Sequence, residues 1–306
     1  MAARPRLSAA ARAVLGTVLG AVAARTAYAA LRRRPPRGEA TWTRTNHRGE
    51  PITLLEGPAF AAGAGAAAAV VPGLPPKVRA AALLAGVGSG ALGAYDDLYG
   101  AASSKGFKGH LGALARGEVT SGAVKILGIG GAGLAAAALV SRGPLDTVLN
   151  GAAIAGCANL ANLFDLRPGR AIKVGLLTGG PLLAASVLRG SPAAAVAVAV
   201  PLGAAAALLP EDLGERAMLG DAGANALGAL LGLAAVTTLG RPGRLAVLGT
   251  VAALTAASEK VSFTKVIAAN PTLNRLDMLG RRPVEPKKAD QAEPVEPVDS
   301  VEPSGV

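Results

Sequence analysis

Residues 191–209 read SPAAAVAVAVPLGAAAALL and contain no charged side chain. About 20 apolar residues in an α-helix cross the hydrocarbon core of a bilayer, so this stretch predicts a transmembrane helix. Eight further stretches have a similar length and composition, at residues 8–31, 52–71, 78–95, 119–140, 144–164, 169–188, 222–239 and 243–260. The sequence therefore predicts an all-α fold, a polytopic integral membrane helical bundle with about nine transmembrane helices (nine to ten).

The composition also favours a membrane protein. Of 306 residues, 51% are hydrophobic and 17% are charged, whereas a soluble domain carries roughly 25% charged residues. Basic residues are scattered over many loops and 3% of residues are aromatic, so the net charge of +11 indicates membrane topology, with no nucleic acid as partner. One cysteine, Cys157, and two histidines, His47 and His110, exclude a disulfide framework and a cysteine zinc site. Any metal is therefore expected to have oxygen ligands.

The distribution of basic residues predicts the orientation of the chain. The loops on one side of the predicted bundle hold 18 Lys and Arg residues and those on the other side hold 8. The positive-inside rule places the richer side in the cytoplasm, which predicts a multi-pass plasma-membrane protein with its N-terminus outside and its C-terminus in the cytoplasm. A cleavable signal peptide is the alternative for residues 8–31, although that stretch lacks a clean apolar core.

Two parts of the chain differ in composition. Residues 1–283 contain all the predicted helices and are expected to form one transmembrane domain. Residues 284–306 loosely repeat Pro, Glu, Val and Lys. Because such a segment has too little apolar surface to bury, it predicts a disordered cytoplasmic tail.

Carboxylates at the ends of the predicted helices are the first candidates for function, because ionisable groups are costly at membrane depth. Asp96 and Asp97 close the third stretch, and neighbouring helical side chains point about 100° apart, so one is expected to face a site and the other a neighbouring helix or loop. Asp221 lies between Gly220 and Gly223, where a tightly turning backbone lets a carboxylate reach Mg²⁺. Simple helix termination or capping is the alternative for all three carboxylates.

Two amides and a carboxylate are spaced three residues apart at the end of the fifth stretch. Asn159, Asn162 and Asp165 therefore share one helix face. Such a row suits the recognition of a base or a sugar, and it equally suits a hydrogen-bonded seam between helices. Both interpretations stay open at this point. All of these polar groups fall on the predicted cytoplasmic side.

Five motifs in this order resemble one family. They are Asn46-His47-Arg48-Gly49-Glu50-Pro51-Ile52-Thr53, Tyr95-Asp96-Asp97, Lys105-Gly106-Phe107-Lys108-Gly109-His110, Asn159-Leu160-Ala161-Asn162-Leu163-Phe164-Asp165 and Met218-Leu219-Gly220-Asp221-Ala222-Gly223-Ala224. The set is similar to that of the polyprenyl-phosphate N-acetylhexosamine-1-phosphate transferases of glycosyltransferase family 4, which include the phospho-N-acetylmuramoyl-pentapeptide transferase of peptidoglycan synthesis. The resemblance covers nearly all of the chain up to about Pro283.

The resemblance implies a specific enzyme activity. Members of the family transfer a sugar 1-phosphate from a UDP-linked amino sugar to polyprenyl phosphate at the cytoplasmic membrane face and release UMP, in the synthesis of peptidoglycan or a related envelope glycan. It implies Mg²⁺ as cofactor, with Mn²⁺ as a substitute. A homodimer is a further expectation.

The resemblance also assigns roles to individual residues. It implies that Asp221 binds the metal and that Asp96 and Asp97 orient the lipid phosphate and the metal, with a base as an alternative role for one of them, so these three are the candidate catalytic residues. The candidate substrate-binding residues are Lys105 and Lys108 for the phosphates, Asn159, Asn162 and Asp165 for the nucleotide, and Arg167 and Arg170, whose guanidiniums suit phosphates.

Three departures from the family pattern bear on activity. No histidine follows His110, so the family's late histidine motif has no counterpart. The Asp-Gly-x-Asp-Gly continuation is here Asp165-Leu166-Arg167-Pro168-Gly169-Arg170, and Ala224 stands at the position of the signature serine. The first alternative is therefore a non-catalytic relative that binds lipid phosphate or an envelope-assembly partner. A transporter is the second, since glycine-broken helices and intramembrane polar groups suit one.

Overall fold

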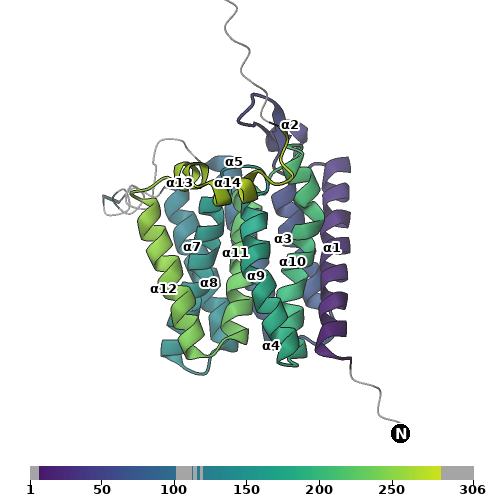
Figure 1. Cartoon of the computed structure of the whole chain (residues 1–306), viewed down its shortest axis with the longest axis vertical. Helices are drawn as coiled ribbons and strands as arrows, with labels where there is room; N and C mark the ends of the chain where they lie inside the picture. The colour runs from purple at the N-terminus through teal and green to yellow at the C-terminus, as the bar shows by residue number, and fades with distance from the viewer. Residues whose placement is uncertain (1–6, 101–111, 113–115, 118–119, 284–306) are drawn as a thin grey trace, which may run out of the picture.

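The computed structural model describes residues 7–100, 112, 116–117 and 120–283 (Figure 1). Its elements, in chain order, are α1 (Ala9–Arg33), α2 (Glu39–Trp42), β1 (Thr43–Thr45), β2 (Pro51–Thr53), α3 (Glu56–Val70), α4 (Pro76–Ala82), the π-helical segment η1 (Leu83–Gly88), α5 (Ser89–Tyr99), α7 (Ser121–Val140), α8 (Pro144–Phe164), α9 (Arg170–Leu188), α10 (Pro192–Leu213), α11 (Gly220–Thr238), α12 (Arg241–Ser258), α13 (Phe263–Ala269) and α14 (Pro271–Met278). Lys105, Lys108 and the tail at 284–306 lie outside the described residues.

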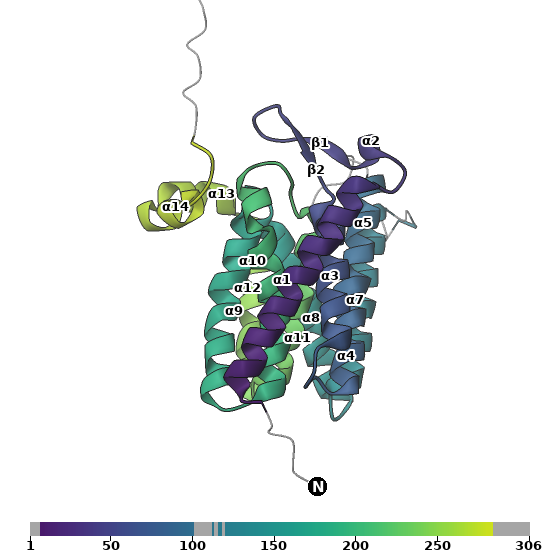
Figure 2. The same cartoon turned by 90° about the vertical axis from the view of Figure 1, so that its right-hand side faces the viewer.

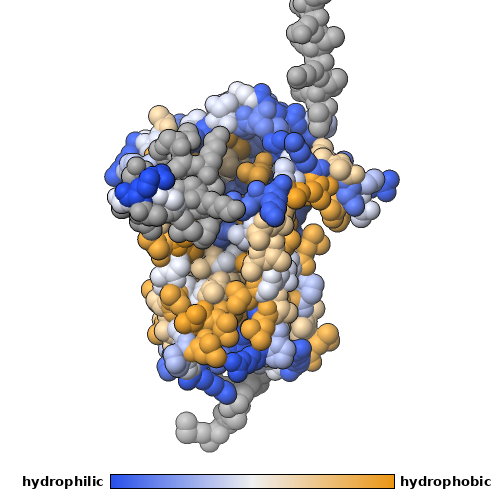
Figure 3. Space-filling view, turned by 90° about the vertical axis from the view of Figure 1, so that its left-hand side faces the viewer, coloured by the Kyte–Doolittle hydropathy of each residue, from blue (hydrophilic) through white to orange (hydrophobic). Residues whose placement is uncertain are grey.

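The long helices run up and down side by side as a bundle, with the hairpin and α13–α14 at one end (Figures 1 and 2). Five of the helices, α4, α8, α10, α12 and α14, have a proline at their first turn, where its missing N–H costs no hydrogen bond. Hydrophilic residues gather at both ends of the bundle, and a hydrophobic band lies between them (Figure 3). The prediction of an all-α membrane bundle is confirmed.

The predicted number of about nine spans is not confirmed. Within the described residues, six stretches are long and apolar enough to cross a membrane, or seven if α12 and α13, bent by 94° at their junction, count as one broken span. The six are Ala9–Arg33, Pro76–Tyr99, Gly122–Val140, Pro144–Phe164, Arg170–Leu188 and Pro192–Leu213. The predicted span at 52–71 contains only the 15 residues of α3, because Pro51–Thr53 pair with β1 instead.

α11 is the central helix of the bundle. Nearly all of its residues from Gly220 to Val236 are buried, and it packs against α3, α5 and α8. Glycines permit this close packing: a Cβ at Gly228 would lie 2.1 Å from the carbonyl oxygen of Cys157, and one at Gly93 would lie 2.2 Å from that of Asp221. Small residues at helix contacts are typical of membrane bundles. The position of Asp221 is therefore set by backbone-to-backbone contact with α5.

The antiparallel hairpin of β1 and β2 packs on the same end of the bundle as the start of α11. Thr43 pairs with Thr53 and Thr45 with Pro51. The carbonyl oxygen of Thr53 accepts a hydrogen bond from the N–H of Met218 at 3.0 Å. The first polar loop is thereby attached to the segment that leads into α11, which brings Thr53 and Met218, 165 positions apart in the sequence, to one place.

Candidate functional site

Three of the predicted carboxylates meet at the end of the bundle that carries the hairpin. Lys125, from the first turns of α7, places its Nζ 2.8 Å from Oδ2 of Asp96 and also hydrogen-bonds Oδ2 of Asp221. The side chains of Lys125 and Asp96 are each 17% exposed and that of Asp221 is 24% exposed, so this ion-paired group is sheltered but open to small ligands. One ammonium thus bridges carboxylates from two helices.

The sequence prediction did not include Lys125. It lies within an apolar stretch, and a lone charge in a predicted span is the signal that could have singled it out. Its partners could not be predicted, because they come from α5 and α11. Among the residues that the structure describes, it forms the ion pairs with Asp96 and Asp221.

Asp97 has a different partner from Asp96. Its Oδ1 accepts a hydrogen bond from the N–H of Asp221 and its Oδ2 one from the N–H of Ala222, both at 3.0 Å. These two N–H groups belong to the first turn of α11 and have no acceptor within that helix. Asp97 therefore caps α11 and holds Asp221 in place, whereas Asp96 faces Lys125, as expected for adjacent carboxylates on a helix.

The backbone around this cap is also tied to the hairpin. Gly220 has a φ of +57°, a left-handed conformation that glycine adopts without strain. The carbonyl oxygen of Asp97 accepts a hydrogen bond from Nη2 of Arg44 at 2.6 Å, which connects α5 to β1. The site is thus held by α5, α7, α11 and the hairpin together.

Asp165, at the C-cap of α8, adjoins the start of α11. It accepts a hydrogen bond from the N–H of Gly220, and its Oδ2 is buried without a partner among the described residues. Burial, with the negative charges of Asp212 and Asp221 nearby, raises the pKa of the Asp165 carboxyl well above its usual range. Asp165 therefore contacts the segment that carries Asp221, although the two residues are far apart in the sequence.

Two further buried acids adjoin Asp165, and the sequence prediction did not include them as site residues. Glu56 is fully buried, and neither of its carboxylate oxygens has a hydrogen-bond partner among the described residues. Asp212 is 2% exposed, and its Oδ1 accepts a hydrogen bond from the N–H of Gly169 at 2.8 Å. Unpaired carboxylates are costly to bury in their charged form. A concentration of acidic groups therefore extends inward from the surface carboxylates.

The arrangement of the carboxylates bears on metal binding. Across the part of the chain that the structure describes, no group of three or more His, Cys, Asp or Glu side chains could hold a metal ion by itself. Mg²⁺ commonly binds through one or two carboxylates, with water and substrate phosphates completing its coordination. Asp96 and Asp221 both direct an oxygen to the same ammonium, so this pair of hard donors fits a Mg²⁺ ion that arrives with a diphosphate.

One of the two predicted asparagines, Asn159, lines a cavity that begins beside Lys125. The cavity has a volume of about 520 Å³ and runs between α7, α8, α11 and α12. Asn159 lines it and its Nδ2 is 3.5 Å from Oγ1 of Thr255 on α12. Asn162 is half-buried. Most of the lining is apolar, with Ile129, Leu248 and Val251 among its members.

The two predicted arginines have different surroundings. Arg170 is 4% exposed and forms a bidentate ion pair with Asp277, with Nε–Oδ1 and Nη2–Oδ2 distances of 2.7 and 3.0 Å. Its Nη1 also donates to Oγ1 of Thr264 at 2.9 Å, so Arg170 attaches α13 and α14 to α9. Arg167 is half-buried, and its only hydrogen bond among the described residues is a 3.5 Å contact with the carbonyl oxygen of Leu166. Arg167 is thus the better placed of the two for an incoming anion.

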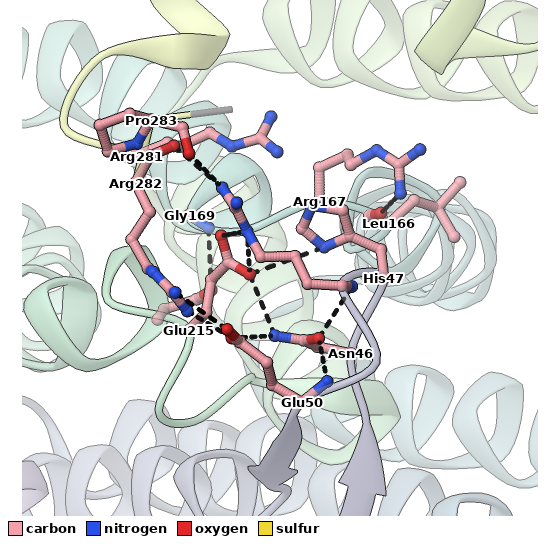
Figure 4. A network of polar contacts seen from close by, with 12 residues as sticks. Asn46, His47, Glu50, Leu166, Arg167, Gly169, Glu215, Arg281, Arg282 and Pro283 are labelled. Atoms are coloured by element: carbon pink, nitrogen blue, oxygen red, sulfur yellow. Dashed lines mark hydrogen bonds and ion pairs between the residues drawn. The ribbon is translucent and has the colours of Figure 1, made fainter. Parts of the chain in front are cut away.

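A polar network connects the first loop to the end of the described chain (Figure 4). The buried carboxylate of Glu215 accepts hydrogen bonds from Nδ2 of Asn46 and Nε of Arg48, each at 3.0 Å. Glu50 forms an ion pair with Arg282 and accepts hydrogen bonds from its guanidinium. These hydrogen bonds lower the pKa of the Glu50 carboxyl to about 2. His47 lies 3.7 Å from Glu215, yet partial burial lowers its pKa. This network fixes the loop that carries His47 beside Arg167 (Figure 4).

No model of a known protein family matches the chain, and no curated protein shows significant similarity to it. The function therefore has to be inferred from the motifs and from the geometry of the site.

Proposed function

We propose that the chain is an integral membrane transferase that moves an N-acetylhexosamine 1-phosphate from a UDP-sugar to polyprenyl phosphate and releases UMP. The reaction is assigned to the cytoplasmic face of the plasma membrane, in the synthesis of peptidoglycan or a related envelope glycan. The observation that carries this proposal is the convergence of Asp96, Asp97 and Asp221 around Lys125 at one end of the bundle, next to a largely apolar cavity.

The cavity beside Lys125 suits a lipid acceptor. Its apolar walls between α7, α8 and α12 would pack against the isoprenoid chain by van der Waals contact. The phosphate of the lipid would then lie at the polar end of the cavity, where the Lys125 ammonium attracts it. One substrate is thereby oriented with its reactive oxygen toward Asp96 and Asp221.

The reaction itself requires charge neutralisation more than proton removal. A phosphate oxygen of the lipid forms a bond to the sugar-linked phosphorus of the UDP-sugar, and the bond from that phosphorus to the bridging oxygen of UMP breaks. A phosphate monoester has a second pKa of about 6, so the attacking oxygen is already ionised at neutral pH and needs no strong base. Lys125 offsets the negative charge of the phosphates, and Asp97 keeps Asp221 in position through the cap on α11.

Mg²⁺, or Mn²⁺, fits the pair of Asp96 and Asp221 described above. When bound, it supplies a positive charge that polarises the diphosphate. We assign binding of the donor nucleotide to Asn159, Asn162 and Asp165. Its phosphates are assigned to Arg167 and His47. The charges of Lys105 and Lys108 would attract the nucleotide to the site. Because Asn159 also lines the cavity proposed for the lipid, the two substrates would meet in this cavity, beside Lys125.

The test is UMP release by the purified protein in detergent, with polyprenyl phosphate, Mg²⁺ and a panel of UDP-N-acetylhexosamines. Release should require the lipid and the metal, and Asp221→Asn should lower it by roughly 10²- to 10³-fold, the effect of removing one electrostatic group from a catalytic site. Glu39→Gln is the matched control, since Glu39 is an exposed acid near the same end of the chain's bundle. Equal release by wild type and Asp221→Asn would refute the assignment of Asp221.

A non-catalytic lipid-phosphate-binding protein is the second candidate. It is favoured by the position of Lys125, whose ammonium already neutralises two of the carboxylates. It is also favoured by the loss of the second carboxylate after Asp165, where the chain has arginines, one of which, Arg170, is paired with Asp277. This candidate predicts binding of polyprenyl phosphate that depends on Lys125, without UMP release from any donor. The two candidates are separated by measuring lipid binding and UMP release on the same preparation.

A further inference from the structure

A second cavity, with a polar lining, lies at the opposite end of the bundle from the carboxylates. It has a volume of about 590 Å³, within the range of small-molecule sites. It is formed where α4, α8 and α12 begin and where α7 and α11 end, and Figure 1 places these helix ends away from α13 and α14. Its charged lining residues are Lys77, Arg142, Arg244 and Asp146.

The cavity carries an excess of positive charge. Its three cations come from three separate segments of the chain and outnumber the single carboxylate of Asp146. Among the described residues, none of these four side chains takes part in an ion pair. The nearby Arg79 differs, because it donates its hydrogen bonds to the carbonyl oxygens of Ala69, Val71 and Leu74. The cations of the cavity thus keep most of their hydrogen-bonding capacity for a ligand.

One of the cations is oriented by buried polar groups. Arg244 donates from Nε to the carbonyl oxygen of Leu239 at 3.0 Å, and its Nη1 is 3.4 Å from Oδ1 of Asn150. Asn150 is 2% exposed and donates in turn to Oγ of Ser141 at 2.8 Å. A buried amide is costly unless it is hydrogen-bonded, so this arrangement holds the guanidinium at the cavity in a defined direction.

We propose that this cavity binds a phosphate group, that of an anionic phospholipid headgroup or of free phosphate. Guanidinium groups match phosphate oxygens in geometry, and ammonium groups add charge. The cavity lies at the ends of membrane-spanning helices, where headgroups are found, and its three cations match the negative charge of an anionic headgroup. Leu139, Val140 and Val236 give it an apolar wall on which the glycerol and the first part of an acyl chain can pack.

The proposal is tested by native mass spectrometry of the full chain in a neutral detergent. Phosphatidylglycerol, phosphatidylcholine with the same acyl chains, and inorganic phosphate are added separately. The test variant is the double substitution Lys77→Gln and Arg142→Gln, which removes two exposed cations. The matched control is Arg189→Gln with Arg241→Gln, which removes two exposed cations near the same end but outside the cavity.

Wild type should retain phosphatidylglycerol more strongly than phosphatidylcholine. Retention should fall about fivefold for each cation removed from the cavity, the value of one basic residue near a membrane surface, and should stay unchanged in the control. Cation-dependent binding of inorganic phosphate in place of the lipid would support the site and identify free phosphate as its ligand.

Equal anion binding by the wild type and the cavity variant, or an equal loss in the control, would overturn the proposal. Because Lys77 and Arg142 are exposed, their substitution should leave the fold intact, and helical circular dichroism of each variant checks this. The readout is binding at the far end of the bundle. A failure of the transferase proposal therefore leaves this test unaffected.

Discussion

Replacing Asp97 with alanine removes the cap of the central helix. Two hydrogen bonds of 3.0 Å, from the N–H groups of Asp221 and Ala222, lose their charged acceptor. Loss of an N-cap side chain typically costs about 1 kcal/mol, and each sheltered N–H left without a partner costs about 1–3 kcal/mol. Some of these groups will regain partners from water, so we expect Asp97→Ala to lower the free energy of unfolding by about 3 kcal/mol. Asp97→Asn keeps one acceptor oxygen and should cost about 1 kcal/mol.

The measurement is equilibrium unfolding in mixed micelles by titration with sodium dodecyl sulfate, followed by the loss of helical circular dichroism. Asp146→Ala is the control, because Asp146 is an acidic residue in the first turn of α8 whose side chain forms no hydrogen bond among the described residues. Its loss removes the interaction with the helix dipole, worth about 0.3–1 kcal/mol, together with a screened attraction to the cations of its cavity. If Asp97→Ala destabilised the protein no more than Asp146→Ala, the capping role of Asp97 would be wrong.

Three further predictions follow from the packing and the charges. Gly228→Ala should destabilise the protein by about 1–3 kcal/mol, since its Cβ would lie 2.1 Å from a carbonyl oxygen of α8. Gly130→Ala is the control, because a Cβ there would have no atom within 4 Å, and it should be neutral or slightly stabilising. Thermal unfolding of both variants measures the difference. Lys125→Met should destabilise by about 2 kcal/mol or more, because two sheltered carboxylates lose their cation, and adding Asp221→Asn should restore part of that loss. A double variant as unstable as the single one would contradict this. The ion pair of Glu50 contributes its full stabilisation above the pKa of the unfolded chain, about 4.5. This contribution should vanish as the pH falls through about 2, the pKa of Glu50 in the folded protein. The stability difference between wild type and Glu50→Gln should therefore shrink between pH 4.5 and pH 2.

The helical segments could be predicted well because their signal is local. The stretch at 144–164 coincides with α8, and that at 169–188 differs from α9 by one residue. The length of an apolar run is a property of neighbouring residues and needs no knowledge of the fold. The stretch at 52–71 was less accurate, because the pairing of Pro51–Thr53 with β1 shortened its helix, and strand pairing depends on a second segment.

The candidate site was predicted in part. The sequence brought attention to Asp96, Asp97 and Asp221, which the structure gathers in one place. It did not separate their contacts, since both members of an adjacent pair look alike until the neighbouring helices are known. Lys125 and Glu56 were missed as site residues although each is a single charge in an apolar stretch, because only the packing of the helices shows their burial and their neighbours.

By itself, the sequence determined that this protein is an all-α membrane bundle with polar groups at its helix ends, because segment length, hydropathy and the order of motifs are written along the chain. Only the tertiary structure decided that Asp97 caps α11, that Lys125 bridges two helices and that three cations from separate segments share one cavity. The physical reason is that hydrogen bonds and ion pairs act over a few ångströms. Which side chains come that close is set by the packing of glycine-rich helices, and not by their separation along the chain.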